Sequence, residues 1–268
     1  MKAALKYVGK SRYTLEDLKE IITILRAPDG CPWDREQTSS TLKKYLLEES
    51  AELADAIDDN QPEDICEECG DVLMNLMMQT LVAEEKNDFS FADVVKEEYD
   101  KMIRRHPHVF GEDSVNSSGE VLGLWEKIKK SEKHSAERKS VLDGIPRALP
   151  QLSRAEKIQK KAAKCGFDWV KYEDIFDKIN EEIGEARTAI AGGNDGEINE
   201  ELGDLLFAVV NLIRFLKRDP EQLLKESNAK FSHRFKLIER MVADSGREWQ
   251  SFSPDELDAM WNRAKTMK

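Results

Sequence analysis

The segment EEIGEARTAIAGGNDGEINEELGD (residues 181–204) contains two groups of carboxylates separated by a short polar stretch. The sequence AGGND is typical of a tight turn, and the flanking apolar residues recur at helical spacing. The segment therefore predicts two antiparallel helices joined by a short loop. In a chain with 53 acidic residues, a run of acids is usually a solvated helix face. The question is whether these carboxylates serve a chemical role.

Helical periodicity predicts where these acids point. At about 100° per residue, Glu182 and Glu185 fall on one flank of their helix, and Glu201 and Asp204 fall on the same flank of the next, whereas Glu181 points outward. Four converging carboxylates repel one another unless a cation is present, and hard oxygen ligands suit Mg²⁺, with Mn²⁺ as an alternative. We expect the apolar stripes of the two helices to face each other: Phe176, Ile179, Ile183, Ala186 and Ile190 against Ile198, Leu202, Leu205, Leu206, Val209 and Ile213.

The same pattern occurs earlier in the chain. Residues 48–76 align with residues 181–209 without a gap, and 11 of the 29 positions are identical. The matching metal ligands in the first half are Glu49, Glu52, Glu68 and Asp71. An internal duplication of this length predicts two domains, at 1–137 and 153–268, joined by a linker over the Gly- and Pro-containing stretch 138–152.

The whole chain is expected to be all-α, because strand-like alternation is not sustained anywhere. The expected helices span 14–26, 38–58, 63–86, 90–105 and 119–134 in the first half, and 151–164, 172–191, 197–217, 220–243 and 254–267 in the second. Irregular chain is expected at RAPDGCPWD (26–34) and RRHPHVFGEDSVNSS (104–118).

Composition excludes several classes of function. The net charge of −12 argues against non-specific nucleic-acid binding, because such binding needs a basic surplus. The most apolar run, LLFAVVNLI (205–213), is too short to span a bilayer, so no membrane association is expected. The sequence has no apolar signal segment near its start, which favours a cytoplasmic location. The CxxC at Cys66 and Cys69 lacks a second pair and is expected to be part of a helix.

The acids and several further motifs resemble the MazG family of nucleoside triphosphate pyrophosphohydrolases. The motifs are EExxE followed by ExxD in both halves, CPWD (31–34), RRHPHVFG (104–111) and LWEKIKK (124–130). The resemblance implies tandem MazG-type helical bundles, assembled as a homodimer or higher oligomer, that hydrolyse nucleoside triphosphates to monophosphate and pyrophosphate with Mg²⁺. It assigns metal binding to the eight acids above. It also places cations and an aromatic ring at the nucleotide: Lys230, Arg234 and Trp261, with Lys101, Arg105 and Trp125 at comparable places in the first half.

The implied chemistry is attack of a metal-activated water on the α-phosphate, with Glu181 or Glu48 as a candidate base. The outward direction of Glu181 counts against direct metal coordination. A pyrophosphohydrolase for dUTP or phosphoribosyl-ATP is an alternative substrate class. A regulatory protein that binds a nucleotide or alarmone without cleaving it, and a purely structural helical scaffold, are alternatives of other kinds. The sequence alone favours the second half as the main catalyst, because its motif set is the more regular.

Overall fold

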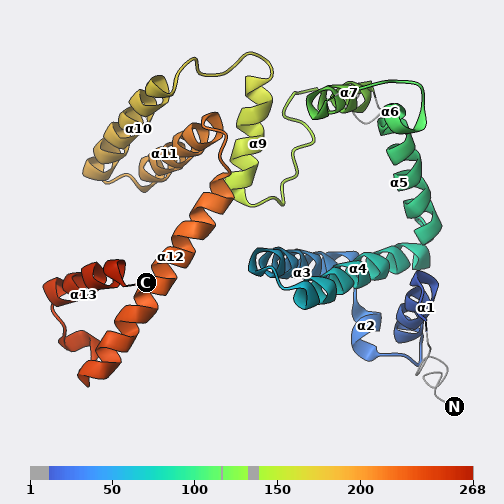
Figure 1. Ribbon diagram of the computed structural model, residues 1–268, viewed down its shortest axis with the longest axis horizontal. Coiled ribbons are helices and arrows are strands. Elements are labelled where there is room, and N and C mark those ends of the chain that lie inside the picture. The colour runs from blue at the N-terminus through green and yellow to red at the C-terminus, as the bar shows by residue number, and fades with distance from the viewer. Residues whose placement is uncertain (1–11, 116, 132–138, 268) are drawn as a thin grey trace. The chain divides into compact units, whose positions relative to one another are not determined.

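The computed structural model describes residues 12–115, 117–131 and 139–267. The chain divides into two compact units, Met1–Glu132 and Lys133–Lys268, each with its own internal contacts. Every regular element within the described ranges is a helix (Figure 1), as the sequence predicted. No helix there is both long and apolar enough to cross a membrane.

Unit 1 contains two long central helices and several shorter ones. Its helices are α1 (Leu15–Arg26), α2 (Pro32–Glu36), α3 (Ser39–Asp59), α4 (Pro62–Glu85), α5 (Phe91–Arg105), α6 (Pro107–Phe110) and α7 (Ser118–Ser131). Its core lies between α1, α3 and α4, where Ile22, Leu42, Met77 and Met78 are almost fully buried. Burial of each such side chain stabilises the unit by roughly 1.5–3 kcal/mol.

Unit 2 repeats the central pair and extends it with a long helix. Its helices are α9 (Gln151–Ala163), α10 (Tyr172–Gly192), α11 (Asp195–Phe215), α12 (Pro220–Ser245) and α13 (Pro254–Thr266), with a 3₁₀ turn at Trp249–Ser251. A hydrophobic cluster joins α13 to the C-terminal half of α12, centred on Ile238, Val242 and Ala264. Figure 1 shows α13 beside that half of α12 and away from the α10–α11 pair.

The duplication seen in the sequence is also a structural one. Helices α3 and α4 begin at Ser39 and Pro62, and α10 and α11 begin at Tyr172 and Asp195, so the same 23-residue interval separates each pair of starts. Residues in the left-handed conformation end the first helix of each pair: Asn60 (φ 53°) and Gly193 (φ 72°). Asparagine and glycine are the residues that accept this conformation at a helix C-terminus. Each unit therefore contains the same helical hairpin.

The apolar stripe predicted for the hairpin of unit 2 is only partly correct. The buried side of α10 is formed by Ile175, Glu182, Ala186 and Ala189. By contrast, much of the predicted stripe is exposed, including Phe176, Ile190, Leu202, Leu206 and Val209. The buried side instead includes the small residues Ala186 and Ala189 on α10 and Ala208 on α11, because packing against the neighbouring helices decides which side is covered.

Two stretches expected to be irregular contain short helices. Residues 32–36 form α2, and residues 107–110 form α6. Each begins with a proline at its first position, where the missing N–H costs nothing and the fixed φ angle suits a helix. The predicted end of the helix at 119–134 and the predicted domain boundary at 137–138 fall largely on residues outside the described ranges.

Candidate metal and nucleotide site

Three of the four predicted acids of unit 2 lie together. Glu182 comes from α10, and Glu201 and Asp204 come from α11 one turn apart. Each offers a carboxylate oxygen, and these atoms all lie within 4.8 Å of one another. A single cation bound between them would contact all three side chains. We call this group the unit 2 cradle.

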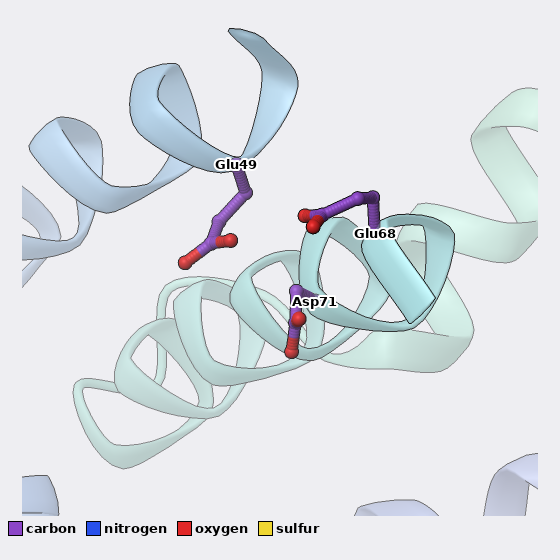
Figure 2. Close-up of side chains that lie close together, drawn as sticks. All are labelled: Glu49, Glu68 and Asp71. Atoms are coloured by element: carbon purple, nitrogen blue, oxygen red, sulfur yellow. The ribbon is translucent and has the colours of Figure 1, made fainter. Parts of the chain in front are cut away.

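Unit 1 has an equivalent group at the aligned positions, which we call the unit 1 cradle. Figure 2 shows Glu49 extending from α3 toward Glu68 and Asp71 on α4. Carboxylate oxygens of these three residues also lie within 4.8 Å of one another. All three side chains are half-buried, whereas in unit 2 Glu182 is buried and Asp204 is exposed.

The fourth predicted acid of each set, Glu185 or Glu52, lies outside these groups but acts on them electrostatically. Burial, followed by the charges of Glu185 and Glu182, raises the pKa of Glu201 above its ordinary value. Burial, followed by the charges of Asp71 and Glu52, likewise raises the pKa of Glu49. Both clusters therefore carry like-charge repulsion that a bound cation would relieve.

Glu182 has one oxygen engaged and one oxygen free. Its Oε1 lies 2.8 Å from Nζ of Lys178, and its Oε2 is buried without a hydrogen-bond partner among the described residues. The exposed fraction of Glu182 is 4%. A buried carboxylate oxygen without a partner is costly, and a metal ion is one group that can satisfy it. Glu68 in unit 1 has a buried, unpartnered Oε2 as well.

The two candidate bases lie on exposed helix faces. Glu181 contacts Nζ of Lys178 at 2.7 Å, and Glu48 contacts Nζ of Lys44 at 3.1 Å. Neither residue belongs to the carboxylate groups found among the described residues. The outward direction that periodicity predicted for Glu181 is thus the one observed, and its role as a base stays a prediction.

The predicted nucleotide-binding cations and tryptophans form separate clusters. In unit 2, the Arg234 guanidinium lies 5.8 Å from the ring centroid of Trp261, which also contacts Phe231. Lys230 is exposed on the same helix, α12. In unit 1, the Arg105 guanidinium lies 5.1 Å from the Trp125 ring, and Lys101 pairs with Glu98. The Arg–Trp pairing is reproduced in both units, but neither cluster contributes to a cradle within the described chain.

A cavity of about 710 Å³ opens beside the unit 2 cradle. Glu182 and Asp204 form part of its wall, with Lys178 next to them. Its remaining wall comes from α9, from the loop before α10, and from the following turns of α11, and it is mainly apolar and aromatic: Ile158, Ala162, Phe167, Trp169, Ile175, Phe207 and Ala208. This volume is within the usual range for small-molecule sites.

A partly buried ion pair joins the loop that lines this cavity to α11. Arg214 on α11 donates through Nη1 to Oδ2 of Asp168 at 3.2 Å and makes a second contact through Nη2. Its Nε also donates to Oδ1 of Asn211 at 2.9 Å. The Arg214 guanidinium lowers the pKa of Asp168 below its ordinary value. The loop is therefore held against α11.

Sequence reasoning missed Lys178, Asp168, Arg214 and the buried Gln159. Lys178 could have been found, because it lies three and four residues before Glu181 and Glu182 on one helix and such pairs interact. The contact between Asp168 and Arg214 spans 46 residues, and no local spacing predicts it. The position of Lys178 is occupied in unit 1 by Tyr45, whose ring packs against Trp33.

Comparison with known proteins agrees with this geometry. The family model for the MazG nucleotide pyrophosphohydrolase domain matches residues 37–110 and 171–240, which contain the two cradles. The chain belongs to the MazG family. The double match explains the duplicated hairpin, and membership makes the chain an enzyme of the pyrophosphohydrolase class, as the sequence predicted.

Several relatives match along most of this chain. The nucleoside triphosphate pyrophosphohydrolase of Escherichia coli K12 is 42% identical over 256 residues, which cover 94% of this chain and 97% of the relative. The nucleoside triphosphate pyrophosphohydrolase/pyrophosphatase MazG of Thermotoga maritima is 41% identical over 250 residues, covering 93% and 95%. YabN of Bacillus subtilis is 44% identical over 248 residues but is matched over 50% of its own length.

Proposed function

We propose that this protein hydrolyses nucleoside triphosphates to nucleoside monophosphate and pyrophosphate with Mg²⁺, and that unit 2 is the main catalyst. The most direct support for this proposal is that residues of the unit 2 cradle also line the neighbouring cavity. Glu182 and Asp204 belong both to the carboxylate group and to that wall. A molecule in the cavity therefore meets the metal ligands at one end. The names of the Escherichia coli and Thermotoga maritima relatives point to the same substrate class.

The residues of the unit 2 cradle fit a hard divalent cation. They offer only carboxylate oxygens, which Mg²⁺ and Mn²⁺ prefer, and the unpartnered Oε2 of Glu182 is available as a ligand atom. We assign metal binding in unit 2 to Glu182, Glu201 and Asp204, with Glu185 as a fourth carboxylate within electrostatic range. A divalent ion held there supplies charge stabilisation for the phosphates and lowers the pKa of water.

Lys178 has two tasks in this proposal. It holds Oε1 of Glu182 at 2.8 Å, which orients the carboxylate and leaves Oε2 for the metal. Lys178 also lines the cavity, so its positive charge lies near the place proposed for the anionic phosphates. Glu181 and Glu182 raise the pKa of Lys178, so it stays protonated over the working range of pH. A positive charge at that position favours binding of a polyphosphate.

We favour unit 2 over unit 1 because of the residues that follow the acids on the second helix of each hairpin. In unit 2 these residues line a cavity, whereas in unit 1 they are buried in the core. Asn211 and Arg214 line the cavity on α11. The positions that correspond in α4 are Met78 and Leu81, which are buried in the core of unit 1. The unit 1 cradle, formed by Glu49, Glu68 and Asp71 with Glu52 nearby, is proposed to bind the same kind of cation beside a filled core.

A homodimer is part of the proposal. Large apolar side chains are exposed on α10 and α11, including Phe176, Ile190, Leu202, Leu206 and Val209. Exposed apolar residues gathered on one hairpin are typical of a surface covered by a partner, and a second copy is the simplest one. A second copy could also bring Lys230, Arg234 and Trp261 to a nucleotide, which one chain does not do within its described residues.

Pyrophosphate and nucleoside monophosphate release from a panel of NTPs and dNTPs with Mg²⁺ tests the function. Glu182→Ala, Glu201→Ala and Asp204→Asn are each expected to lower turnover by at least about 100-fold, because each removes a metal ligand. Nucleotide binding without any product release by the unaltered chain would favour the regulatory alternative. Full Mg²⁺-dependent turnover in all three variants would exclude unit 2 as the main catalyst.

A further inference from the structure

Among the polar residues that line the cavity outside the unit 2 cradle, Gln159 has a buried side-chain oxygen without a hydrogen-bond partner in the described part of the chain. Gln159 lies on α9, and its exposed fraction is 5%. Its Nε2 donates a hydrogen bond of 2.8 Å to the backbone carbonyl of Phe207 on α11. Its Oε1 is buried and has no hydrogen-bond partner among the described residues. Gln159 is thus a buried carboxamide whose nitrogen is hydrogen-bonded and whose oxygen has no partner among the described residues.

The orientation of this carboxamide is fixed by chemistry. A backbone carbonyl can only accept a hydrogen bond, so the nitrogen of Gln159, and not its oxygen, must face Phe207. The oxygen is then left as a lone acceptor on a side chain that lines the cavity. An unpaired buried acceptor is destabilising, and a hydrogen bond from a ligand N–H would relieve that cost.

The surroundings of Gln159 suit a flat, mostly apolar group. Aromatic rings of Trp169 and Phe207 line the same cavity, together with Ile158 and Ala208. Nucleobases stack on aromatic side chains and present N–H donors at their edges. Glu182 and Asp204 lie on the wall of the same cavity, so a molecule with a base at one end and phosphates at the other matches both features.

We infer that the cavity between α9, α10 and α11 is the nucleobase pocket and that Oε1 of Gln159 accepts a hydrogen bond from an N–H of the base. This inference rests on the proposed function and adds the place where the nucleobase of the substrate binds. Adenine and cytosine offer an exocyclic amine, guanine offers an exocyclic amine and a ring N–H, and uracil offers a ring N–H. A single acceptor therefore selects for a base without distinguishing among the four, which agrees with a broad NTP substrate class.

The test is a thermodynamic double cycle of binding affinities, in which one change removes the acceptor from the protein and the other removes the donor from the ligand. Binding to the full chain with Mg²⁺ is measured for α,β-methylene-ATP and for its purine riboside counterpart, which lacks the N6 amine. Gln159→Leu is the variant. The control is Gln151→Leu on the same helix, because the Gln151 amide donates to the backbone carbonyl of Leu149 and does not line the cavity.

Loss of the base amine is expected to weaken binding to the unaltered chain about tenfold, and Gln159→Leu is expected to weaken binding of α,β-methylene-ATP by a similar factor. Gln159→Leu should leave binding of the purine counterpart unchanged, and Gln151→Leu should change neither ligand. Equal weakening of both ligands by Gln159→Leu would mean that Gln159 only joins α9 to α11, and it would overturn the inference.

The ligand arm needs no variant, so it can refute the inference even if Gln159→Leu does not fold. Equal affinity of the unaltered chain for the two ligands would also overturn the inference. Hydrolysis of ATP by the unaltered chain is measured separately. Absence of pyrophosphate release there would refute the proposed function, while the binding cycle would still report on the pocket.

Discussion

The unit 2 cradle predicts a specific response of thermal stability to Mg²⁺. Binding to the folded state alone stabilises it by about 2.7 kcal/mol at a metal concentration 100-fold above Kd. For a unit of this size, that corresponds to a rise in Tm of roughly 10 °C. Glu182→Gln removes one of the three clustered carboxylates and fills nearly the same volume.

We expect this change to weaken Mg²⁺ binding by about 100-fold, because a charged ligand becomes a neutral one. At the same metal concentration the stabilisation then falls to about 0.4 kcal/mol, and the rise in Tm to roughly 1–2 °C. Without metal, Tm should not fall. The variant removes a like charge from the neighbourhood of Glu201, and it keeps an oxygen that can accept a hydrogen bond from Lys178.

The assay is calorimetry or fluorescence-detected melting in chelator and in Mg²⁺. It is performed in a Glu49→Gln background so that the unit 1 cradle does not contribute. The matched control is Glu197→Gln, which removes an equal charge from an exposed residue of α11 that pairs with Asn194. A full Mg²⁺ response in Glu182→Gln, or its loss in Glu197→Gln, would refute the assignment of the ligands.

Contacts elsewhere in the chain give three more predictions. Lys178→Met should weaken binding of Mg²⁺ alone, because the ammonium that orients Oε1 of Glu182 from 2.8 Å is lost, and should weaken binding of Mg·ATP further, because the positive charge beside the phosphates is lost as well; titration calorimetry measures both, and unchanged binding of both would contradict the role of Lys178. Arg26→Met should destabilise unit 1 by about 2–4 kcal/mol in a denaturant titration, because Arg26 donates to Glu85 and to two backbone carbonyls. Arg26 lowers the pKa of Glu85, so this difference should be full above the unfolded pKa of about 4.5 and shrink as pH falls through the lower folded value; a constant difference would contradict the pairing. Leu206→Glu should shift the chain from dimer to monomer in sedimentation analysis, and an unchanged mass would refute the proposed interface.

Much of the fold can be predicted from the sequence because its signals are local. Helical spacing, the glycine turn at Gly193 and the prolines that begin helices all act within a few residues. The duplication was visible for the same reason, since an ungapped match preserves every helical angle. The acids Glu201 and Asp204 could be assigned to one flank because residues at i and i+3 share a helix face.

Other features depended on contacts between distant parts of the chain. The bond from Gln159 to Phe207 spans 48 residues, and the ion pair of Arg214 spans 46, so no periodicity could indicate them. The predicted apolar stripe was partly wrong because packing against neighbouring helices, which periodicity does not show, decides which side of α10 is buried. The sequence alone determined which carboxylates could share a flank. Only the tertiary structure decided which of their oxygens are free and what else faces them, because burial is a property of packed neighbours.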